Sequence, residues 1–415
     1  MSKDESHSTQ SYDARLGVYV DDVYRIVETP KGPRYSTDRA FLIFACEVGS
    51  RFADVALFGR GVDAQEPSDY VLPERVRLIR LPHYGSLTEL GRVSRATAGT
   101  LRAMWRGLSD VEVVWAFGPH PFALGLAVLA TLRGRTVVLG VRQDTLAYHR
   151  SRLPSKAWTP ILGFIRVIDA AYALLARGVP LTAVGATVAH RYRKGKPPLP
   201  IIVSLIRESD VLSKPPSRDW AGAIELMTVG RLEPEKNPLL VVEALAQLDA
   251  RSGGRYHLTW VGRGAMESAV RRRAEELGIA DRITLRGYVP FGESLLDLYR
   301  GAHIFLHVSL TEGVPQVIVE AFASGTPVVA TDVGGVAGAV GGGDAALLVP
   351  PRDAGAIVAA VERLLVDEAF RGRLIENGLA FAREHTLERE ADRVAAFIAN
   401  ARPQSREITA RRTSS

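Results

Sequence analysis

Two periodicities of apolar residues alternate along this chain of 415 residues. Short runs rich in Val, Ile, Leu and aromatic residues are typical of buried strands, and the stretches between them repeat apolar residues at helical spacing. The expected strands of the first half cover residues 15–20, 54–59, 76–82, 112–118, 136–141, 181–185 and 198–206. Those of the second half cover residues 224–230, 257–262, 283–289, 304–309, 327–331 and 345–349. Strands that alternate with helices predict parallel α/β layers in both halves.

A stretch rich in Pro, Ser and charged residues separates the two halves. Its composition is typical of a linker, which we place at residues 206–220. The expected domains are an N-terminal domain over 13–205, a C-terminal domain over 221–385 and a closing helix over 386–401. Residues 1–12 and 402–415 are expected to be disordered, because the tail lacks apolar periodicity and the first residues are polar. Two doubly wound, Rossmann-like domains would bind ligands in the cleft between the carboxyl ends of their strands.

Composition narrows the class of protein. A single cysteine, Cys46, excludes an internal disulfide framework and a multi-Cys metal site. The N-terminal residues lack the apolar segment of a secretory signal. The longest apolar run, ILGFIRVIDAAYALLA, is interrupted by Arg166 and Asp169, and a membrane span needs about 20 apolar residues. The sequence therefore predicts a cytoplasmic protein.

Charge is distributed unevenly. Residues 1–200 contain 27 Lys and Arg against 18 Asp and Glu, whereas the remainder is slightly acidic. This excess favours an anionic partner such as a membrane surface or a phosphorylated acceptor, and we expect no nucleic acid; the alternative is an Arg-rich solvated surface. Residues 87–108 can form a basic amphipathic helix, which predicts peripheral contact with an anionic membrane at the inner face of the plasma membrane. The alternative is ordinary packing of that helix against the first sheet.

A basic loop follows the first strand of the second half. The strand ends at Gly230, and Arg231 and Lys236 precede a helix that starts at Pro238. Arg binds phosphate through two hydrogen bonds, Lys supplies a point charge and a helix N-terminus favours anions, so this loop suits a phosphate. The next strand leads into Gly262 and Gly264, but Glu267 stands where the dinucleotide fingerprint has its third glycine. That departure argues against a nicotinamide cofactor and favours a tight turn.

Two carboxylates lie within the mostly apolar segment TEGVPQVIVEAFASGTPVVATDVGG, Thr311–Gly335. Glu312 precedes the N-terminus of an expected helix, where Gly313 and Pro315 favour a turn and a helix start. Glu320 lies inside the helix, which Gly325 ends. Carboxylates beside free helix amides offer acceptors for hydroxyls and donors for an anion, as a sugar diphosphate requires. The alternative is a capping Glu312 and a solvated Glu320, although an unpaired charge in an apolar run is costly.

Four motifs in order, VGRLEPEKN, VGRG, GYVP and E-x7-E followed by AFASGTPVVATDVGG, resemble the retaining GT-B glycosyltransferases of family 4. The resemblance extends from about Ile224 to Pro350. It implies that the domain over 221–385 binds the nucleotide sugar and that the domain over 13–205 binds the acceptor. It implies that Arg231 and Lys236 neutralise the diphosphate of a nucleotide sugar, that Glu312 accepts from sugar hydroxyls and that Glu320 accepts from the ribose. It further implies donor contacts from residues Gly230, Gly262, Gly264, Tyr288, Val289, Gly313, Val314 and Pro315. Such enzymes use no metal and no cofactor, because Arg, Lys and a helix end stabilise the leaving diphosphate.

The N-terminal half matches the family only in pattern. Many members have a glycine-rich loop after the first strand, whereas this chain has DDVYRIVETPKGPRYST there. Arg142, Gln143 and Asp144 stand where a His-Gly is often found, and His120 lies one strand earlier. We predict Asp144 and His120 as catalytic, and Asp22 and Arg142 as acceptor-binding.

The resemblance therefore predicts a sugar transfer in the synthesis of a cell-envelope glycan, a glycolipid or a glycosylated metabolite. The alternatives are a GT-B epimerase or phosphorylase, a nicotinamide-dependent oxidoreductase and a non-catalytic glycan-binding relative.

Overall fold

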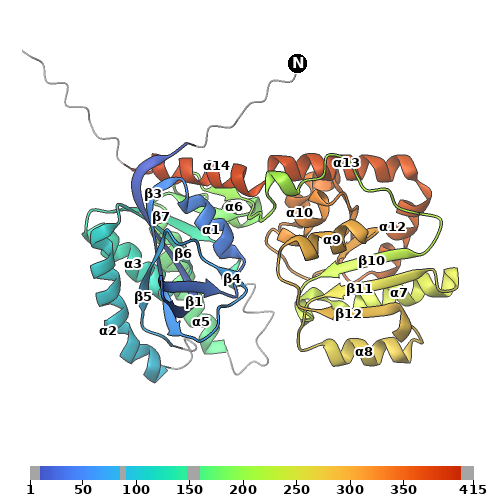
Figure 1. The fold of residues 1–415 in the computed structure, drawn as a ribbon, viewed down its shortest axis with the longest axis horizontal. Coiled ribbons are helices and arrows are strands. Elements are labelled where there is room, and N and C mark those ends of the chain that lie inside the picture. The colour runs from blue at the N-terminus through green and yellow to red at the C-terminus, as the bar shows by residue number, and fades with distance from the viewer. Residues whose placement is uncertain (1–9, 85–89, 147–158, 403–415) are drawn as a thin grey trace, which may run out of the picture.

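The computed structural model describes residues 10–84, 90–146 and 159–402, which form two α/β lobes side by side (Figure 1). The N-terminal lobe is built on strands β1 (Tyr12–Thr29), β2 (Gly32–Thr37), β3 (Phe52–Asp63), β4 (Tyr70–Val71), β5 (Val76–Leu81), β6 (Val113–Gly118), β7 (Thr136–Val141), β8 (Leu181–Val184) and β9 (Leu199–Ile201). Its helices are α1 (Phe41–Gly49), α2 (Leu90–Gly107), α3 (Pro121–Leu132), α5 (Thr159–Leu175) and α6 (Ala186–Arg191).

The C-terminal lobe is built on β10 (Ile224–Val229), β11 (Tyr256–Val261), β12 (Ile283–Gly287), β13 (Ile304–His307), β14 (Val328–Thr331) and β15 (Ala346–Val349). Its helices are α7 (Pro238–Ser252), α8 (Glu267–Glu276), α9 (Glu293–Gly301), α10 (Gln316–Ala323), α11 (Val336–Ala339), α12 (Ala354–Val366) and α13 (Glu368–Glu384). Helix α14 (Leu387–Asn400) follows. Residues 1–9 and 403–415, which make up most of the ends expected to be disordered, lie outside the described residues.

The strands that the sequence predicts are parallel in both sheets, and the first sheet adds the antiparallel strands β2 and β4. The second sheet has the order β12-β11-β10-β13-β14-β15 with every pair parallel. Its order reverses beside β10, and such a reversal opens a crevice at the carboxyl ends of the strands. The first sheet has the order β1-β6-β7-β8-β9, with β3 and β5 beyond β1. Strands β13 and β14 are buried along their whole length, as expected where helices cover both faces of a parallel sheet.

The segment after the first strand differs from the predicted loop. Strand β1 continues to Thr29 and forms an antiparallel hairpin with β2, so Asp21 and Asp22 lie within the strand. The pairing of β1 with β3 shifts between Tyr19 and Val23, which marks an irregularity at the two aspartates. Such irregularities redirect side chains away from the regular alternation of a strand. The hairpin was not predicted because apolar and polar residues do not alternate regularly in the second part of β1 and in β2.

Helix α2 covers the described part of the segment 87–108. Residues 85–89 lie outside the described residues, and α2 starts at Leu90. Met104 and Leu108 are fully buried in the core of the N-terminal lobe. Part of the apolar side therefore packs against the first sheet, whereas Trp105 is 40% exposed, and peripheral membrane contact stays a prediction. Among the helices described, none is long and apolar enough to span a bilayer.

The last helix returns to the first lobe. Helix α14 lies along the N-terminal lobe, whereas α13 lies along the C-terminal lobe (Figure 1). Thr386 caps α14 by accepting a hydrogen bond from the amide of Arg389. Its apolar side joins the core formed by α1, β1 and β3, through the buried residues Leu387, Ala391, Val394, Ala395 and Ile398. The chain thus crosses between the lobes twice.

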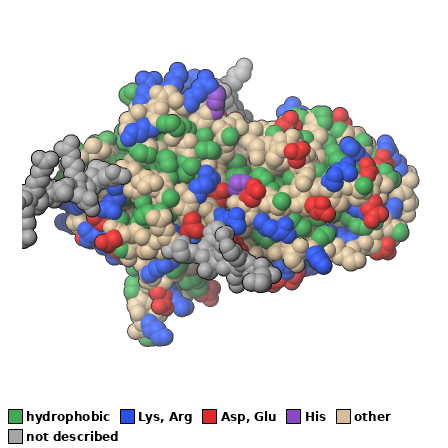
Figure 2. Space-filling model, turned by 90° about the horizontal axis from the view of Figure 1, so that it is seen from above, with side chains coloured by type: hydrophobic (Ala, Val, Ile, Leu, Met, Phe, Trp, Pro, Cys, Tyr) green, Lys and Arg blue, Asp and Glu red, His purple; other side chains and the backbone are tan. Residues whose placement is uncertain are grey.

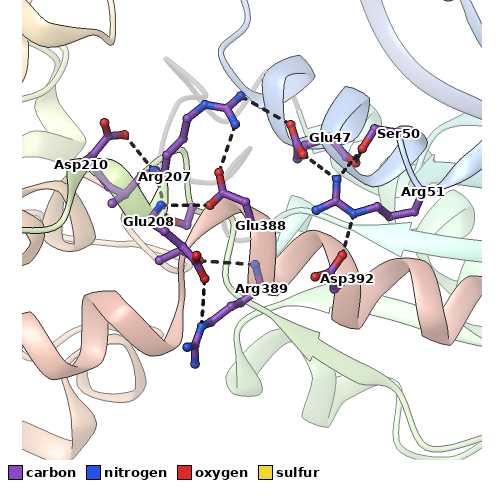
Figure 3. Close-up of polar contacts among 12 residues, drawn as sticks. Glu47, Ser50, Arg51, Arg207, Glu208, Asp210, Glu388, Arg389 and Asp392 are labelled. Carbon is purple, nitrogen blue, oxygen red and sulfur yellow. Dashed lines mark hydrogen bonds and ion pairs between the residues drawn. The ribbon is translucent and has the colours of Figure 1, made fainter. Parts of the chain in front are cut away.

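Polar contacts surround the two crossings (Figure 3). The amide of Leu387 donates to the carbonyl of Ile206 at 2.6 Å, so the crossing segments are bonded to each other. Arg207 bridges Glu388 of α14 at 3.1 Å and Glu47 of α1 at 3.5 Å. The last strand of the first sheet ends at Ile201, and the first strand of the second sheet begins at Ile224. The exact domain boundaries at 205 and 385 stay a prediction.

Candidate functional site

A cavity of about 240 Å³ lies between the lobes at the carboxyl ends of the strands. The C-terminal lobe lines it with the loops after β10, β13 and β14, and the N-terminal lobe with the segments after β7 and β8. It brings together the predicted residues Asp144, Arg231, Lys236, Glu312 and Gly313. Residues separated by more than 160 positions therefore meet in one cleft. This is where parallel α/β sheets bind ligands.

Glu312 is the centre of the polar contacts in this cavity. Lys236 from the loop after β10 is ion-paired with its Oε1, and His307 Nε2 lies 3.2 Å from the same atom. Burial opposes ionisation, but the charge of Lys236 and the contact with His307 outweigh it and hold the pKa of Glu312 well below its usual range. Burial lowers the pKa of His307, whose side chain is only 2% exposed. Glu312 is therefore a carboxylate at neutral pH.

His307 was not among the predicted site residues. It ends β13 inside the apolar run IFLHVS, and a lone histidine in such a run is usually a core residue. Its position at the carboxyl end of a strand was the available signal.

The backbone at Glu312 is held by the glycine turn after β14. A Cβ added at Gly334, whose φ is +56°, would lie 2.1 Å from the carbonyl oxygen of Glu312. The amide of Gly335 donates to that same oxygen at 3.3 Å. Helix α10 then begins at Gln316 with Pro315 as its N-cap and ends before Gly325, which has a φ of +62°. The first amides of α10 lack intrahelical partners, as at any helix start, but the residues of this turn do not line the cavity.

Arg231 and the other glycines have distinct environments. Arg231 lines the cavity, is 52% exposed and pairs with Glu235 at 2.8 Å. A Cβ at Gly262 would lie 2.0 Å from the carbonyl oxygen of Gly230, and one at Gly264 would lie 2.3 Å from that of Leu232. Gly262 and Gly264 thus allow the loops after β10 and β11 to touch, which is the tight-turn interpretation of that motif.

Glu320 is buried within α10. It is 5% exposed and accepts a hydrogen bond of 2.9 Å from the hydroxyl of Tyr299. Burial raises the pKa of Glu320 to about 7, and the Tyr299 hydrogen bond partly offsets the rise. The alternative of a solvated Glu320 is wrong. Glu320 does not line the cavity of 240 Å³.

The residues predicted in the N-terminal lobe divide into two groups. Asp144 lines the cavity and is ion-paired with Arg191 of α6. Arg142 instead has its guanidinium 4.3 Å from the centre of the Phe41 ring. Asp22 pairs with Arg39 at 3.2 Å, and burial raises its pKa against the opposing charges of Arg39 and Arg142.

His120 belongs to a buried cluster around Asp21. Its Nδ1 accepts from the amide of Phe122 at 3.3 Å and lies 3.0 Å from the Tyr19 hydroxyl. Its Nε2 lies 3.4 Å from Asp21, which also accepts from Tyr84 at 2.6 Å. Burial lowers the pKa of His120, so the ring is neutral near pH 7. Neither His120 nor Asp22 nor Arg142 lines the cavity.

The predicted residues Tyr288, Val289 and Val314 lie near contacts between the lobes. The hydroxyl of Tyr70 in β4 lies 3.2 Å from that of Tyr288 and accepts from the amide of Phe291 at 3.1 Å. A Cβ at Gly185 would lie 2.6 Å from Val314 Cγ2. Val289 packs at the edge of the C-terminal core. The cleft is therefore bordered by direct contacts between the two lobes.

The surface repeats the charge asymmetry of the sequence. Lys and Arg gather along one edge of the N-terminal lobe, whereas acidic and basic side chains alternate over the C-terminal lobe (Figure 2). No group of three His, Cys, Asp or Glu side chains that could hold a metal ion occurs in the part of the chain that the structure describes. Metal-independent catalysis stays a prediction.

Residues 218–381 match the family model of the glycosyl transferases group 1. This segment contains Arg231, Lys236, Glu312 and Glu320. The chain is 38% identical over 160 residues to a D-inositol 3-phosphate glycosyltransferase of Corynebacterium glutamicum, which is 37% of this chain and 38% of the relative. It is 34% identical over 170 residues to the O-antigen chain mannosyltransferase B of Escherichia coli, 41% of this chain and 43% of that protein. The chain therefore spans about two fifths of the length of these curated relatives.

Solved structures match over nearly the whole chain. The sucrose-phosphate synthase of Thermosynechococcus elongatus aligns with a TM-score of 0.69 at 18% identity, covering 93% of this chain and 98% of that one. The Anabaena protein HepE in complex with UDP and glucose aligns with a TM-score of 0.67 at 15% identity, covering 93% and 100%. WaaG, a glycosyltransferase involved in lipopolysaccharide biosynthesis, aligns with a TM-score of 0.67 at 17% identity, covering 92% and 99%. The predicted GT-B fold is confirmed.

Proposed function

We propose that this protein transfers a sugar from a nucleotide-diphosphate donor to an acceptor hydroxyl with retention of the anomeric configuration. The observation that carries the proposal is the ionised Glu312 in the cleft, paired with Lys236 beside the first turn of α10. A carboxylate and a cation within one small cavity match the hydroxyls and the diphosphate of a nucleotide sugar. The free amides at the start of α10 would favour the same anion. The match of residues 218–381 to the group 1 glycosyl transferases supports the same donor class.

The reaction breaks the bond between the anomeric carbon and the oxygen of the β-phosphate. Arg231 and Lys236 stabilise the charge that develops on the departing diphosphate, together with the amides that begin α10. Glu312 accepts hydrogen bonds from the sugar hydroxyls and orients the ring. The acceptor oxygen bonds to the anomeric carbon from the face that the phosphate leaves, and its proton passes to a phosphate oxygen. No metal or cofactor takes part in this proposal.

Glu320 has the proposed role of accepting from the ribose. Tyr299 uses one of its carboxylate oxygens, which leaves acceptor capacity on the other. Contacts of Gly230, Gly262, Gly264, Tyr288 and Val289 with the donor are part of the same proposal. Two of these, Gly262 and Gly264, would act by keeping the loops close.

We propose that residues of the N-terminal lobe bind the acceptor. Of the two residues of that lobe predicted as catalytic, Asp144 lines the cavity and His120 does not. We therefore propose that Asp144 contacts the acceptor hydroxyl. His120, Asp22 and Arg142 would act from the neighbouring polar clusters. The relatives named for inositol phosphate, O-antigen and lipopolysaccharide support a role in cell-envelope glycans, glycolipids or glycosylated metabolites in the cytoplasm.

Donor binding is tested with a panel of UDP-, GDP-, ADP- and TDP-sugars, by the shift in melting temperature and by slow hydrolysis of the donor. We expect one nucleotide class to stabilise the protein. Stabilisation by NAD and by no nucleotide sugar would contradict the proposal and favour an oxidoreductase.

The role of Glu312 is tested with Glu312→Gln, and Glu275→Gln on the exposed face of α8 is the matched control. The first variant should lose transfer while it still binds the free nucleoside diphosphate, and the second should be unchanged. Transfer that survives Glu312→Gln refutes the assigned role. Donor binding without hydrolysis or transfer to any acceptor favours the glycan-binding alternative, and sugar 1-phosphate formation from a glycan favours the phosphorylase.

A further inference from the structure

A second cavity, of about 870 Å³, lies on the N-terminal lobe beside the β1–β2 hairpin. It shares no lining residue with the cavity between the lobes. Its walls are residues 29–35, at the end of the hairpin, and residues 71–77, which lead from β4 into β5. We call this cavity the hairpin groove. Ligand sites in proteins typically occupy about 300–1,000 Å³, so the groove has the volume of a binding site.

The groove opens because two segments that pair at one end separate at the other. Strand β4 pairs with β2 at Ser36 and Thr37, and the amide of Leu72 donates to the carbonyl of Tyr35 at 2.8 Å. Beyond Leu72 the chain turns away and joins β3 as β5, starting at Val76. The hairpin continues as far as its own turn. The groove is thus built from the segment in which the sequence departs from the family that it resembles.

The floor of the groove is apolar and anchored. Leu72 and Val76 are buried in the core cluster that includes α1, and Tyr35 packs against the same cluster. Val71 in one wall is 50% exposed. The C–H faces of sugar rings pack on apolar and aromatic side chains of this kind. Because its floor belongs to the core, the groove exists before any ligand binds, as small-molecule sites usually do.

The rim of the groove is positively charged. Lys31, Arg34 and Arg75 are exposed, and none of them has an ion-pair partner among the residues that the structure describes. Arg77 is paired with Asp110 at 2.7 Å. The one acid among the lining residues is Glu74. Since the rim cations are not neutralised within the protein, the groove suits a ligand that carries several negative charges.

Two other kinds of anionic chain fit the groove less well. An added peptide strand needs main-chain donors and acceptors along the free edge of β2, but Pro33 has no amide and the Tyr35 carbonyl already accepts from Leu72. Sites for single-stranded nucleic acid stack the bases on several aromatic rings. Tyr35 is the one aromatic residue among those that line the groove.

We propose that the hairpin groove binds a linear anionic glycan whose sugars carry carboxylate groups. Arginine forms two parallel hydrogen bonds with a carboxylate, so Arg34 and Arg75 bind acidic groups from the two walls, and Lys31 supplies a further charge. The ring faces rest on Tyr35 and Val71. Combined with the proposed sugar transfer, the groove keeps a polymer attached to the enzyme at a second point and so raises its effective concentration. The binding itself does not depend on that transfer.

The experiment is titration calorimetry of the full chain with oligomers of similar length at low ionic strength. Oligogalacturonate carries a carboxylate on each sugar, a malto-oligosaccharide is neutral, and oligoglutamate and oligothymidylate represent acidic peptides and nucleic acids. Oligogalacturonate should bind most tightly, and at least about tenfold more tightly than the neutral oligomer, as a charge-assisted hydrogen bond supplies. Absent binding of oligogalacturonate, or equal binding of the neutral oligomer, would overturn the inference. Equal or tighter binding of oligoglutamate or oligothymidylate would assign the groove to a peptide or a nucleic acid instead.

Variants of the groove separate it from general attraction to a basic lobe. K31E/R34E reverses two charges of the rim and should weaken binding of oligogalacturonate at least about tenfold. R272E/R286E is the matched control, because both arginines are exposed on the C-terminal lobe and the change in net charge is the same. Val71→Ser removes an apolar contact and should weaken binding about threefold or more, whereas Val366→Ser, on the exposed side of α12, should not.

Equal affinities of K31E/R34E and R272E/R286E would overturn the inference, because the attraction would then be general. K31E/R34E should keep the shift in melting temperature that a nucleotide sugar produces, since neither residue lines the cleft. Loss of that shift would contradict a separate site. A donor panel without any shift, with oligogalacturonate still bound, would reject the proposed transfer alone. All the substituted side chains are exposed, so the melting temperatures of the variants should stay within a few degrees of the parent.

Discussion

Glu320 gives the structure its clearest dependence on pH. The folded protein raises the pKa of this carboxyl from 4.5 to about 7 by burial, a difference that corresponds to about 3 kcal/mol. The folded state therefore binds this proton more tightly than the unfolded state. The resulting stability is fully present below pH 4.5, falls as the pH rises towards 7, and is lost above it.

Glu320→Gln removes this titration and keeps a side chain of nearly the same shape. Urea unfolding of both proteins between pH 4 and pH 8 gives the difference in their free energies of unfolding, in which the other titrating groups cancel. We expect the parent to lose about 3 kcal/mol relative to the variant over this range. A difference that does not change with pH would refute the burial argument.

The same pair of proteins tests the proposed contact with the ribose. If the ionised carboxylate accepts from a ribose hydroxyl, the nucleoside diphosphate that the protein binds should bind more tightly as the pH rises through 7. Glu320→Gln should lose that pH dependence. Titration calorimetry in two buffers of different ionisation enthalpy would also show proton release on binding to the parent alone.

Three further substitutions test the site. Lys236→Met removes the partner of Glu312 and a cation for the diphosphate, so donor affinity in calorimetry should fall by roughly tenfold or more, as for a charge-assisted hydrogen bond. The exposed Lys194→Met is the control, and equal affinity of the two variants would show that Lys236 is not part of the donor site. Gly334→Ala places a Cβ against the Glu312 carbonyl and should cost at least about 1–2 kcal/mol of stability in urea, whereas Gly338→Ala, with open space around it, should not; equal midpoints would contradict this. Tyr70→Phe removes contacts with Tyr288 and Phe291 and should favour open lobes by about 1 kcal/mol, seen as a larger radius of gyration in solution scattering; an unchanged radius would contradict it.

The sequence was most informative where local pattern and tertiary environment agree. Strands β13 and β14 are apolar along their length because helices cover both faces of a parallel sheet, so their pattern alone identified them. The place of Glu312 in the cleft could be predicted because the loop after such a strand lies at the carboxyl edge of the sheet, whereas its role stays a prediction. The signals for the two strands and for Glu312 lie in residues that are close together in the sequence.

Features set by contacts distant in sequence could not be predicted in this way. His307 acquires its role from Lys236 and Glu312, which reach it from different loops. The β1–β2 hairpin is stabilised by pairing with β3 and β4, so its weak alternation carries little signal. The exposed side of α5 could not be distinguished from core by sequence, because an apolar residue does not show whether another element covers it.

Helix α14 has a consequence for the order in which the molecule is completed. Its five buried apolar residues belong to the core of the N-terminal lobe, yet they are synthesised only after the whole C-terminal lobe. At about 1.5–3 kcal/mol for a large apolar side chain, Leu387, Val394 and Ile398 together contribute an amount comparable to the whole stability of a domain. During translation the N-terminal lobe must therefore wait, with its core uncovered, while the entire C-terminal lobe is made. The lobe that emerges second is the first able to finish folding, and a nascent chain released before Ile398 would leave the N-terminal side of the cleft without a stable support.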